Sequence, residues 1–470
     1  MKSKLLALAL TCALALGLSP LASGSALAAA TPLAPAAAAA PAWASNAVIY
    51  EVNVRDFTTE GTFKAFANSL PRLRAMGVNV LWFMPIYPIG QKNRKGTMGS
   101  PYSVANYTAV NPDLGTSADF KNLVTLAHSN GFKVILDWVA NHSAYDNPWA
   151  TAHKEWYTQD GNGNIISPAG TDWTDVADLN YDSQGLRTAM IAAMKSWVTN
   201  YGVDGFRCDA AGMVPTDFWN QAATALRAIN PKQPPFLLAE TQDVPDLLNS
   251  AFVADYGWHL KDILYAFGNG SGLKSDFNIN QLSNQGAYPN GTYPMVFITN
   301  HDENSWTGSL SQLYGGGVQA MATLSFTVPG IPLIYDGQEV GSNKQLKFFE
   351  KDLIDWNLSS ANSKANIAFY TRLVSLKHKN PALFNGAAGG PFVLARNDST
   401  KVLSFSRTKG TNRVYTLINA SNLTQNVTVQ WGKDGKSYYR LTDGKKVTVG
   451  GTVHYALKPW QYQVWSTVAP

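Results

Sequence analysis

The sequence predicts an α/β protein whose main domain is a closed barrel of eight parallel strands surrounded by helices, a (β/α)8 or TIM barrel. Short apolar runs alternate with amphipathic helical patterns at intervals of about 30–50 residues, which is typical of βαβ units. Eight such runs occur, and eight strands close a barrel of this type. No glycine-rich phosphate-binding pattern follows the first run, which disfavours the open doubly wound sheet.

Three strands are predicted in the first part of the barrel, at residues 47–57, 78–85 and 132–137. The second of them, VNVLWFMP, is an unbroken apolar run, as expected of a strand that is buried on both faces of a parallel sheet. Phenylalanine and leucine residues at helical spacing follow the first strand, and Thr116 is placed to begin a helix before the third strand. These units establish the alternation of strand and helix.

Five further strands and four helices continue this alternation to the end of the barrel. The strands are predicted at 203–209, 236–240, 252–256, 295–299 and 332–335. The helices are predicted at 184–201, 216–229, 316–327 and 363–378.

The barrel is interrupted once and is followed by a different kind of domain. Residues 143–182, rich in Gly, Asn, Asp and Trp, lengthen the interval between the third and fourth strands, so we expect a small inserted domain there. The barrel itself is assigned to residues 45–142 and 183–385. Residues 386–470 predict an all-β C-terminal sandwich, with short strands at 401–406, 412–418, 426–430 and 461–465.

The N-terminus has the features of a secretory signal peptide, which we assign to residues 1–28. Two lysines lie among the first four residues, an apolar stretch follows at 5–18, and Ala26-Leu27-Ala28 provides a cleavage site between small residues. Residues 29–44 are rich in Ala and Pro and are expected to form a leader without a fold of their own. We therefore expect a secreted protein, extracellular or periplasmic.

Composition narrows the range of partners. The net charge is only +5 over 470 residues and no Lys/Arg cluster occurs, so a nucleic-acid partner is not expected. No stretch after the signal has the 18 consecutive apolar residues of a membrane span. Cys12 lies in the signal, so Cys208 is the single cysteine of the mature chain and no intrachain disulfide can form. We expect a monomer.

Four of the predicted strands end in polar residues, and in a barrel their carboxyl ends meet at one rim. The third strand leads into Asn141 and His142, the fifth ends at Glu240, and the seventh leads into His301 and Asp302. Each residue alone has a structural explanation, because Asn and Asp often cap the following helix. Together they indicate a catalytic rim.

The fourth strand, Gly205-Phe206-Arg207-Cys208-Asp209, is the centre of this pattern. Residues two apart in a strand lie on the same face, so Arg207 and Asp209 are expected together and Cys208 on the opposite, packed face. A guanidinium beside a carboxylate keeps the carboxylate ionised, as a nucleophile requires. The alternative explanation of this pair alone is a structural ion pair.

The four polar segments resemble, in order and spacing, the characteristic regions of the α-amylase family of glycoside hydrolases (family 13). The resemblance covers residues from about 45 to 468, with the insert similar to the family's domain B and the sandwich to its domain C. It implies a secreted retaining hydrolase that cleaves α-1,4-glucosidic bonds in starch, glycogen or maltooligosaccharides through a covalent glycosyl-enzyme.

The resemblance assigns the catalytic roles to three carboxylates. It implies that Asp209 is the nucleophile, that Glu240 is the general acid and later the base, and that Asp302 stabilises the cationic transition state. Two alternatives remain. A glucan transglycosylase or a maltogenic or cyclomaltodextrin-degrading enzyme would use the same chemistry. A non-catalytic glucan-binding protein is disfavoured because all three acids are present.

The resemblance also implies substrate-binding roles for Tyr102, His142, Arg207 and His301. Tyr102 would form an aromatic platform under the sugar that is cleaved, the two histidines would bind its hydroxyl groups, and Arg207 would orient Asp209. Trp138, Trp173 and Trp258 could be further platforms or packing residues.

A calcium ion is the one cofactor that the resemblance suggests, and no organic cofactor is expected. Asn141 and Asp178 match calcium ligands of the family, and hard oxygen ligands suit this ion. The alternative is that these side chains connect barrel and insert by hydrogen bonds. Gly212-Met213 stands where many relatives have Lys-His. The sugar contacts on the leaving-group side are therefore not predicted. The short insert favours an open cleft.

Overall fold

The computed structural model describes residues 40–241, 244, 246–277 and 288–469. The predicted signal peptide and most of the Ala/Pro-rich leader lie outside the described residues. The described chain begins with a 3-10 helix, Ala42–Asn46, in which Trp43 packs on Phe236 with ring centroids 5.4 Å apart. No helix of the described ranges is long and apolar enough to cross a membrane.

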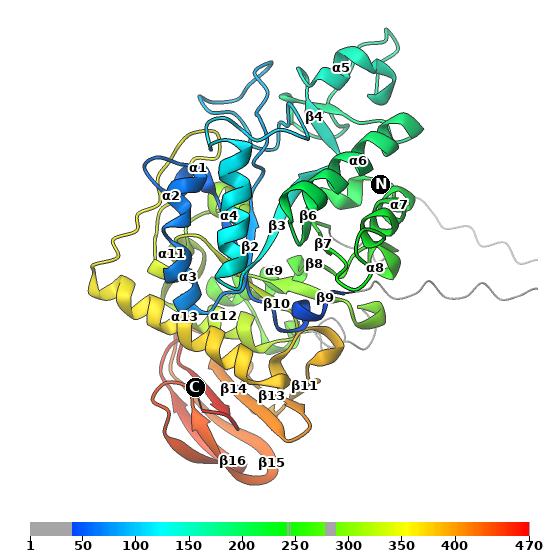
Figure 1. Cartoon of the computed structure of the whole chain (residues 1–470). Coiled ribbons are helices and arrows are strands. Elements are labelled where there is room, and N and C mark those ends of the chain that lie inside the picture. Colours follow the sequence, from blue (N-terminus) through cyan, green and yellow to red (C-terminus); the bar gives the residue numbers. More distant parts are fainter. Residues whose placement is uncertain (1–39, 242–243, 245, 278–287, 470) are drawn as a thin grey trace, which may run out of the picture. The chain divides into compact units, whose positions relative to one another are not determined.

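Eight parallel strands form a closed barrel, which confirms the predicted fold class (Figure 1). The barrel closes where the first strand pairs in parallel with the last, Ile49 opposite Leu333. In order around the barrel the strands are β1 (Ile49–Val52), β2 (Val80–Phe83), β3 (Lys133–Val139), β6 (Gly205–Asp209), β7 (Phe236–Ala239), β8 (Ala254–Tyr256), β9 (Tyr293–Val296) and β10 (Ile331–Tyr335).

Helices cover the outside of the barrel, and buried apolar side chains fill the layer between them and the strands (Figure 1). They are α1 (Val54–Phe57), α2 (Phe63–Ala67), α3 (Leu70–Met76), α4 (Ser117–Ser129), α6 (Gln184–Tyr201), α7 (Thr216–Arg227), α8 (Asp246–Ser250), α9 (Trp258–Gly268), α11 (Leu310–Tyr314), α12 (Val318–Thr327) and α13 (Ala361–Lys379).

The predicted first strand, 47–57, is too long at its carboxyl end. β1 stops at Val52 and α1 begins at Val54. The Asn53 backbone N–H donates to Asp336, and its side chain donates to Asp56 at 2.8 Å. These bonds turn the chain out of the sheet, although the alternation of apolar residues continues.

The chain between β3 and α6 contains a small sheet and a helix. β4 (His142–Ala144) pairs antiparallel with β5 (Val176–Asp178), with His142 opposite Asp178. α5 (Pro148–Ala152) and a 3-10 turn, Lys154–Trp156, lie between them in sequence. This segment therefore starts directly from the carboxyl end of a barrel strand.

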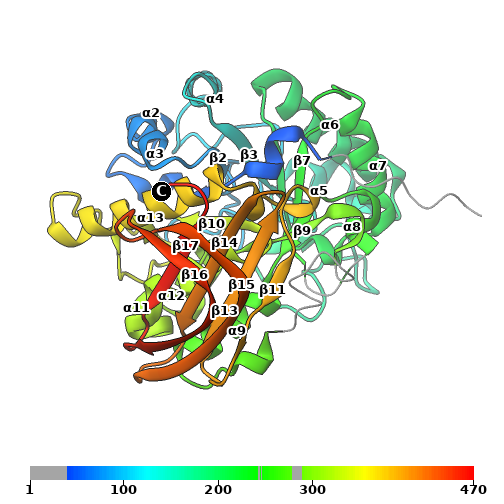
Figure 2. The ribbon, with the colours of Figure 1, turned by 90° about the horizontal axis from the view of Figure 1, so that it is seen from below.

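The C-terminal domain is antiparallel and all-β, as predicted (Figure 2). Its strands are joined in one sheet rather than in two separate sheets, because β15 pairs with β17, with Tyr439 opposite Ser466. The strands are β11 (Phe392–Leu394), β12 (Arg396–Asn397), β13 (Val402–Lys409), β14 (Asn412–Asn419), β15 (Gln425–Arg440), β16 (Lys446–Leu457) and β17 (Tyr462–Ser466).

Two buried cations connect the barrel to this domain. Lys377 on α13 donates to the carbonyl oxygens of Gly330, at 2.9 Å, and Leu383. Arg407 on β13 donates to the carbonyl oxygen of Val328 at 2.9 Å. Neither cation forms an ion pair with a carboxylate of the described chain; backbone oxygens hold Arg407, and backbone oxygens together with Asn385 Oδ1, at 2.6 Å, hold Lys377.

Candidate active site

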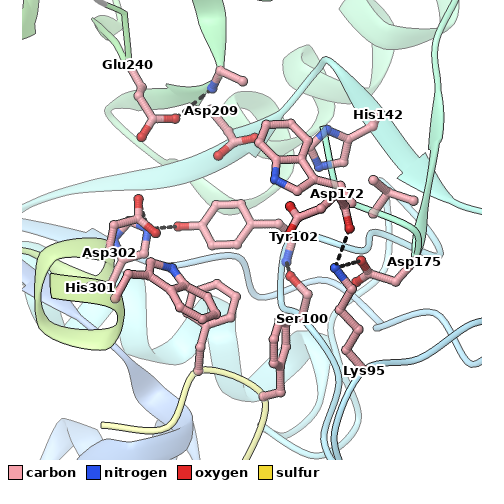
Figure 3. Close-up of a pocket in the computed structure, with 16 residues that line it drawn as sticks. Lys95, Ser100, Tyr102, His142, Asp172, Asp175, Asp209, Glu240, His301 and Asp302 are labelled. Atoms are coloured by element: carbon pink, nitrogen blue, oxygen red, sulfur yellow. Dashed lines mark hydrogen bonds and ion pairs between the residues drawn. The ribbon is translucent and has the colours of Figure 1, made fainter. Parts of the chain in front are cut away.

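A pocket of about 480 Å³ opens at the carboxyl ends of the barrel strands (Figure 3). It is lined by side chains from β-strand ends, from the insert and from the loops after β2 and β10. Six of the seven predicted catalytic and substrate-binding residues line it: Tyr102, His142, Asp209, Glu240, His301 and Asp302.

The seventh, Arg207, lies fully buried beneath the pocket and contacts three carboxylates. Its Nη1 donates to Asp137 Oδ1 at 2.8 Å and to Asp209 Oδ1 at 3.0 Å. Its Nη2 lies 2.6 Å from Glu240 Oε1, in an ion pair without an aligned hydrogen bond. One guanidinium therefore links two predicted catalytic carboxylates to a third, Asp137.

The alternation along β6 places these groups. Arg207 points inward, while Cys208 lies in the apolar layer between strands and helices, as predicted. Aromatic rings enclose the guanidinium, with its Cζ 5.2 Å from the ring centroid of Trp82 and 5.3 Å from that of Tyr256. Because the cation is removed from water, its contacts with carboxylates are strong and directional.

Glu240 is held by the turn that follows β6. Ala210 has a left-handed backbone, with φ 42°, and its N–H donates to Glu240 Oε2 at 2.8 Å. Burial, together with the charges of Asp209 and Asp302, raises the pKa of Glu240 to about 7 against the opposing effect of Arg207. Glu240 thus holds a proton near neutral pH, as a general acid does.

Asp209 titrates differently from what the Arg207-x-Asp209 pattern predicted. Burial raises its pKa to about 6, and the charges of Asp137 and Asp302 add to this effect. Arg207 lowers the pKa, but it is shared with two other acids and does not outweigh burial. Asp209 still ionises below Glu240, so the two acids differ in the order that their predicted roles require.

His301 and Asp302 form a charged pair at the pocket. His301 Nδ1 lies 2.5 Å from the buried Glu51 Oε1, and its Nε2 lies 3.2 Å from Asp302 Oδ2. Burial lowers the pKa of His301, but the charges of Asp302 and Glu51 raise it well above its ordinary value. For Asp302, burial raises the pKa, yet His301 lowers it to below its ordinary value. Asp302 is therefore an anion facing the pocket.

Tyr102 joins this pair to the acids around Arg207. Its hydroxyl lies 2.8 Å from His301 Nε2 and donates to Asp137 Oδ2 at 3.0 Å. Its ring stacks on His301 and on Phe348, at interplanar angles of 18° and 12°. Tyr102, His301 and Phe348 thus form one stacked group in the pocket lining, and the role of Tyr102 as a sugar platform stays a prediction.

The catalytic-domain model of the alpha amylases matches residues 44–168 and 170–261 of this chain. These residues form an alpha-amylase catalytic domain.

Relatives cover most of this chain at low identity. An alpha-amylase of Haloarcula japonica is 28% identical over 84% of this chain and 58% of its own length. An alpha-1,4-glucan:maltose-1-phosphate maltosyltransferase of Streptomyces coelicolor is 26% identical over 85% of this chain and 62% of its own length. This chain thus spans about three fifths of these two relatives.

A solved structure matches more completely. The noncanonic maltogenic alpha-amylase of Thermotoga neapolitana is 28% identical, with a TM-score of 0.80, and the match covers 91% of this chain and 99% of that one. The barrel, the inserted segment and the C-terminal sheet of this chain are thus a family architecture.

His142 lies at the pocket wall of this alpha-amylase domain and is neutral. Burial lowers its pKa to about 3. Its Nδ1 lies 3.2 Å from Asn141 Nδ2, and its ring contacts Trp173, with centroids 5.3 Å apart. A neutral imidazole can accept one hydrogen bond and donate another, which suits sugar hydroxyls.

The three tryptophans left open by the sequence separate into two groups. Trp173 lines the pocket. Trp138 is fully buried against Tyr87 and Phe206, and Trp258 packs on the barrel core, so both are packing residues.

Sequence reasoning missed several residues that act on the predicted ones. Asp137 and Glu51 are fully buried carboxylates that bond Arg207 and His301, and their signal was a charge within an otherwise apolar strand. The rim residues gave no such signal, because they lie in loops or, for Trp306, in the short π-helix Glu303–Thr307: Lys95, Asp172, Asp175, Trp306, Phe348 and Phe349.

Gly212 stands where many relatives have lysine, and this difference has a steric explanation. A Cβ at this position would lie 2.6 Å from Thr241 Oγ1, so the lysine of other family members would require a shift of the Thr241 side chain. Met213, the next residue, is 48% exposed.

The two predicted calcium ligands lie at neighbouring register positions. Asn141 immediately precedes β4, and Asp178 ends β5 opposite His142. Burial raises the pKa of Asp178, and none of the described lysines or arginines pairs with it. Both side chains offer oxygens that fit a hard cation, although no group of three or more His, Cys, Asp or Glu suited to a metal occurs in the described residues.

Proposed function

We propose that this protein is a retaining glycoside hydrolase that cleaves α-1,4-glucosidic bonds of starch, glycogen or maltooligosaccharides. The observation that carries the proposal is the shared guanidinium: Asp209 and Glu240 both contact Arg207 at the pocket floor. That arrangement suits the separation of about 5 Å between carboxyl groups in retaining enzymes.

In the first step of the proposed reaction, an Asp209 carboxylate oxygen attacks the anomeric carbon of the bound sugar. The bond between that carbon and the glycosidic oxygen breaks, and the oxygen takes the proton of Glu240. Asp302, held as an anion by His301, faces the positive charge that develops on the sugar. The products are a glycosyl ester of Asp209 and a free sugar hydroxyl.

In the second step, a water molecule attacks the same carbon. Glu240, now a carboxylate, takes a proton from the water, and the bond to Asp209 breaks. Each step inverts the anomeric carbon once, so the overall reaction retains its configuration. The enzyme returns to its starting protonation state.

Removing either carboxylate function tests the proposal. We expect Asp209→Asn and Glu240→Gln to lower starch hydrolysis, measured as reducing ends, by at least about 10³-fold, because one removes the nucleophile and the other the acid. Asp182→Asn, at an exposed position outside the pocket, is the matched control and should keep full activity. Near-normal activity in either pocket variant, with an unchanged melting temperature, would overturn the assignment.

Transfer to a sugar acceptor is the second candidate, since the glycosyl ester can react with a hydroxyl group instead of water. This candidate is supported by the similar proteins, which include a maltosyltransferase and a maltogenic alpha-amylase. A time course on maltooligosaccharides separates the two: products longer than the substrate indicate transfer, and shorter ones alone indicate hydrolysis.

We also propose that the protein is exported, cleaved after the Ala26-Leu27-Ala28 motif, and acts as a monomer. A polymeric substrate outside the cell agrees with export. N-terminal sequencing of the protein recovered outside the cytoplasm, and its mass in solution, test these statements. An N-terminus at Met1 or a stable dimer would contradict them.

A further inference from the structure

We infer that the ion pair between Lys95 and Asp175 closes one end of the pocket and limits how many sugar units lie on the retained side of the cleaved bond. This inference rests on the proposed function and adds the length of the product to it. Lys95 Nζ lies 3.3 Å from Asp175 Oδ1, and both residues line the pocket.

The position of this pair follows from the direction of the reaction. Glu240 lies at one end of the pocket, while Lys95, Asp172 and Asp175 lie at the other, with Asp209 and Tyr102 between them (Figure 3). The group that Glu240 protonates departs on the Glu240 side. The sugar units that stay bound to Asp209 must therefore extend toward Lys95.

The segment that carries Lys95 is fastened to the insert. Lys95 Nζ also donates to the backbone oxygen of Asp172 at 2.9 Å. The Gln91 N–H donates to Asp146 Oδ2 at 2.7 Å, and the Asn93 side chain donates to the Thr174 oxygen at 3.4 Å. These contacts are distributed along the segment, so it does not depend on the ion pair alone for its position.

The same segment is fastened to the loop after β10 on its other side. The Met98 N–H donates to the Phe349 oxygen at 2.9 Å, and the Thr97 N–H donates to Glu350 Oε1 at 3.2 Å. Lys95 Nζ itself lies 5.8 Å from the centroid of the Phe349 ring. Residues 91–98 thus span the pocket end from the insert to the opposite loop.

The ion pair is shielded from water well enough to block the path of a sugar chain at this end of the pocket. The Asp175 side chain is 6% exposed and that of Lys95 is 28% exposed. A sugar chain that continued past this point would have to displace a lysine held by a carboxylate, a carbonyl oxygen and an aromatic face. The short insert predicted an open cleft, but the loop after β2 supplies the closure instead.

The closed end of the pocket determines the length of the products. A closed retained side admits a chain only by its non-reducing end, so early products should be short and of uniform length. An open groove would also cut long chains in their middle, which gives fragments of many lengths from the start.

The experiment compares wild type with Lys95→Ala on maltoheptaose labelled at its reducing end, and on amylose followed by iodine staining. We expect wild type to release short non-reducing-end fragments while iodine staining persists. We expect Lys95→Ala to raise the share of longer fragments several-fold and to abolish iodine staining at fewer bonds cleaved, because the blocking ion pair is removed.

Two further variants keep the result interpretable. Lys95→Arg retains a cation that can pair with Asp175 and should restore the wild-type pattern. Lys92→Ala removes an exposed lysine of the same segment that does not line the pocket, and it should change nothing. Melting temperatures show whether each variant folds; if Lys95→Ala does not fold, Asp175→Asn, which removes the charge at similar size, is expected to lengthen the products in the same way.

Fragments of all lengths from wild type at the first time point would overturn the inference. So would unchanged products from a folded Lys95→Ala or Asp175→Asn. Absence of any cleavage by wild type would instead overturn the proposed function, and the inference with it.

Discussion

Arg207 is the residue on which the charges of the pocket depend. It is a single cation among Asp137, Asp209 and Glu240, and it is enclosed by aromatic rings. Because burial raises the pKa of all three carboxyl groups, a single guanidinium cannot keep them all ionised at mildly acidic pH. At the scale of single residues, the protonation states of these three carboxyl groups therefore determine the activity.

The pH dependence of the rate follows from two of these groups. The proposed active form has Asp209 ionised and Glu240 protonated. It accumulates between a pKa of about 6 and a pKa of about 7, so kcat/KM should fall below pH 6 as Asp209 gains a proton and above pH 7 as Glu240 loses one.

Initial rates on maltoheptaose across a pH series measure this profile. In Glu240→Gln the residual rate should lose its alkaline limb, because the titrating group is gone. A wild-type rate that is constant from well below pH 6 to well above pH 7 would contradict the assignment of both groups.

The sequence predicted which residues gather at the pocket but not how they share charge. Arg207 and Asp209 could be placed together because residues two apart in a strand share a face. Asp137 lies on β3, 70 residues earlier in the chain, and is opposite Arg207 because β3 pairs with β6. Glu51 lies on β1 and contacts His301, which follows β9, because the barrel closes between β1 and β10. A pKa depends on all of these contacts, so the pattern Arg207-x-Asp209 alone gave the wrong direction for Asp209.

At the scale of elements, the strand β6 requires a glycine at its start. A Cβ at Gly205 would lie 2.0 Å from the backbone oxygen of Phe236 in the neighbouring strand β7. That oxygen belongs to the sheet and cannot turn aside as a side chain could. The close approach of these two strands positions Arg207, two residues further on.

We expect Gly205→Ala to destabilise the protein by about 3 kcal/mol, because the methyl group forces β6 and β7 apart. Activity should fall as well, since Arg207 and Asp209 move with β6. Gly161→Ala is the matched control: nothing lies within 4 Å of its added Cβ, and its effect should stay within about 0.5 kcal/mol. Chemical denaturation of the three proteins gives the comparison, and an undisturbed Gly205→Ala would refute it.

Elements were predictable where local chemistry determines them. Thr116 caps α4 through its side chain, which accepts from the Asp119 N–H at 3.1 Å, as its position before the helix indicated. The long strand β16 was missed because only two of its twelve residues are buried and a Gly-Gly pair interrupts its alternation, so its pairing with β15, rather than burial, stabilises it. The end of β1 was wrong because a side-chain turn at Asn53 overrides the apolar pattern.

At the scale of the whole described chain, barrel and C-terminal domain share a buried junction. Lys377 and Arg407 both donate to the backbone oxygen of Leu383 there. Burial, and then the charge of Arg407, lowers the pKa of Lys377 well below its ordinary value. The sequence could not show this, because the lysine and the arginine come from different domains.

Lys377→Met should destabilise the protein by about 2 kcal/mol, because carbonyl oxygens lose their donor. It should also change the pH dependence. Between the lowered pKa and the ordinary pKa of about 10.4, the unfolded wild type binds a proton that the folded protein does not, so its stability rises with pH in this window.

In Lys377→Met, stability should no longer rise with pH in this window. Lys364→Met, an exposed position on the same helix, is the control and should keep this rise. Melting temperatures at neutral and alkaline pH provide the measurement, and parallel slopes for wild type and Lys377→Met would contradict the argument.

Calcium is proposed to join the barrel to the insert through Asn141 and Asp178. We expect added calcium to raise the melting temperature of chelator-treated protein, because an ion that binds the folded state alone stabilises it. Asp178→Ala should abolish this rise, while Asp182→Ala, an exposed neighbour, should retain it. Equal melting temperatures of wild type with and without calcium would exclude the site.

The contact between one guanidinium and both catalytic carboxylates also has a consequence in time. Once Asp209 is esterified it carries no charge, so it no longer raises the pKa of Glu240. Arg207 then has one carboxylate fewer to neutralise, and its positive charge acts more strongly on Glu240. Both changes lower the pKa of Glu240 at the moment when the proposed reaction needs a base instead of an acid. The covalent intermediate thereby prepares the residue that will hydrolyse it, without movement of the backbone.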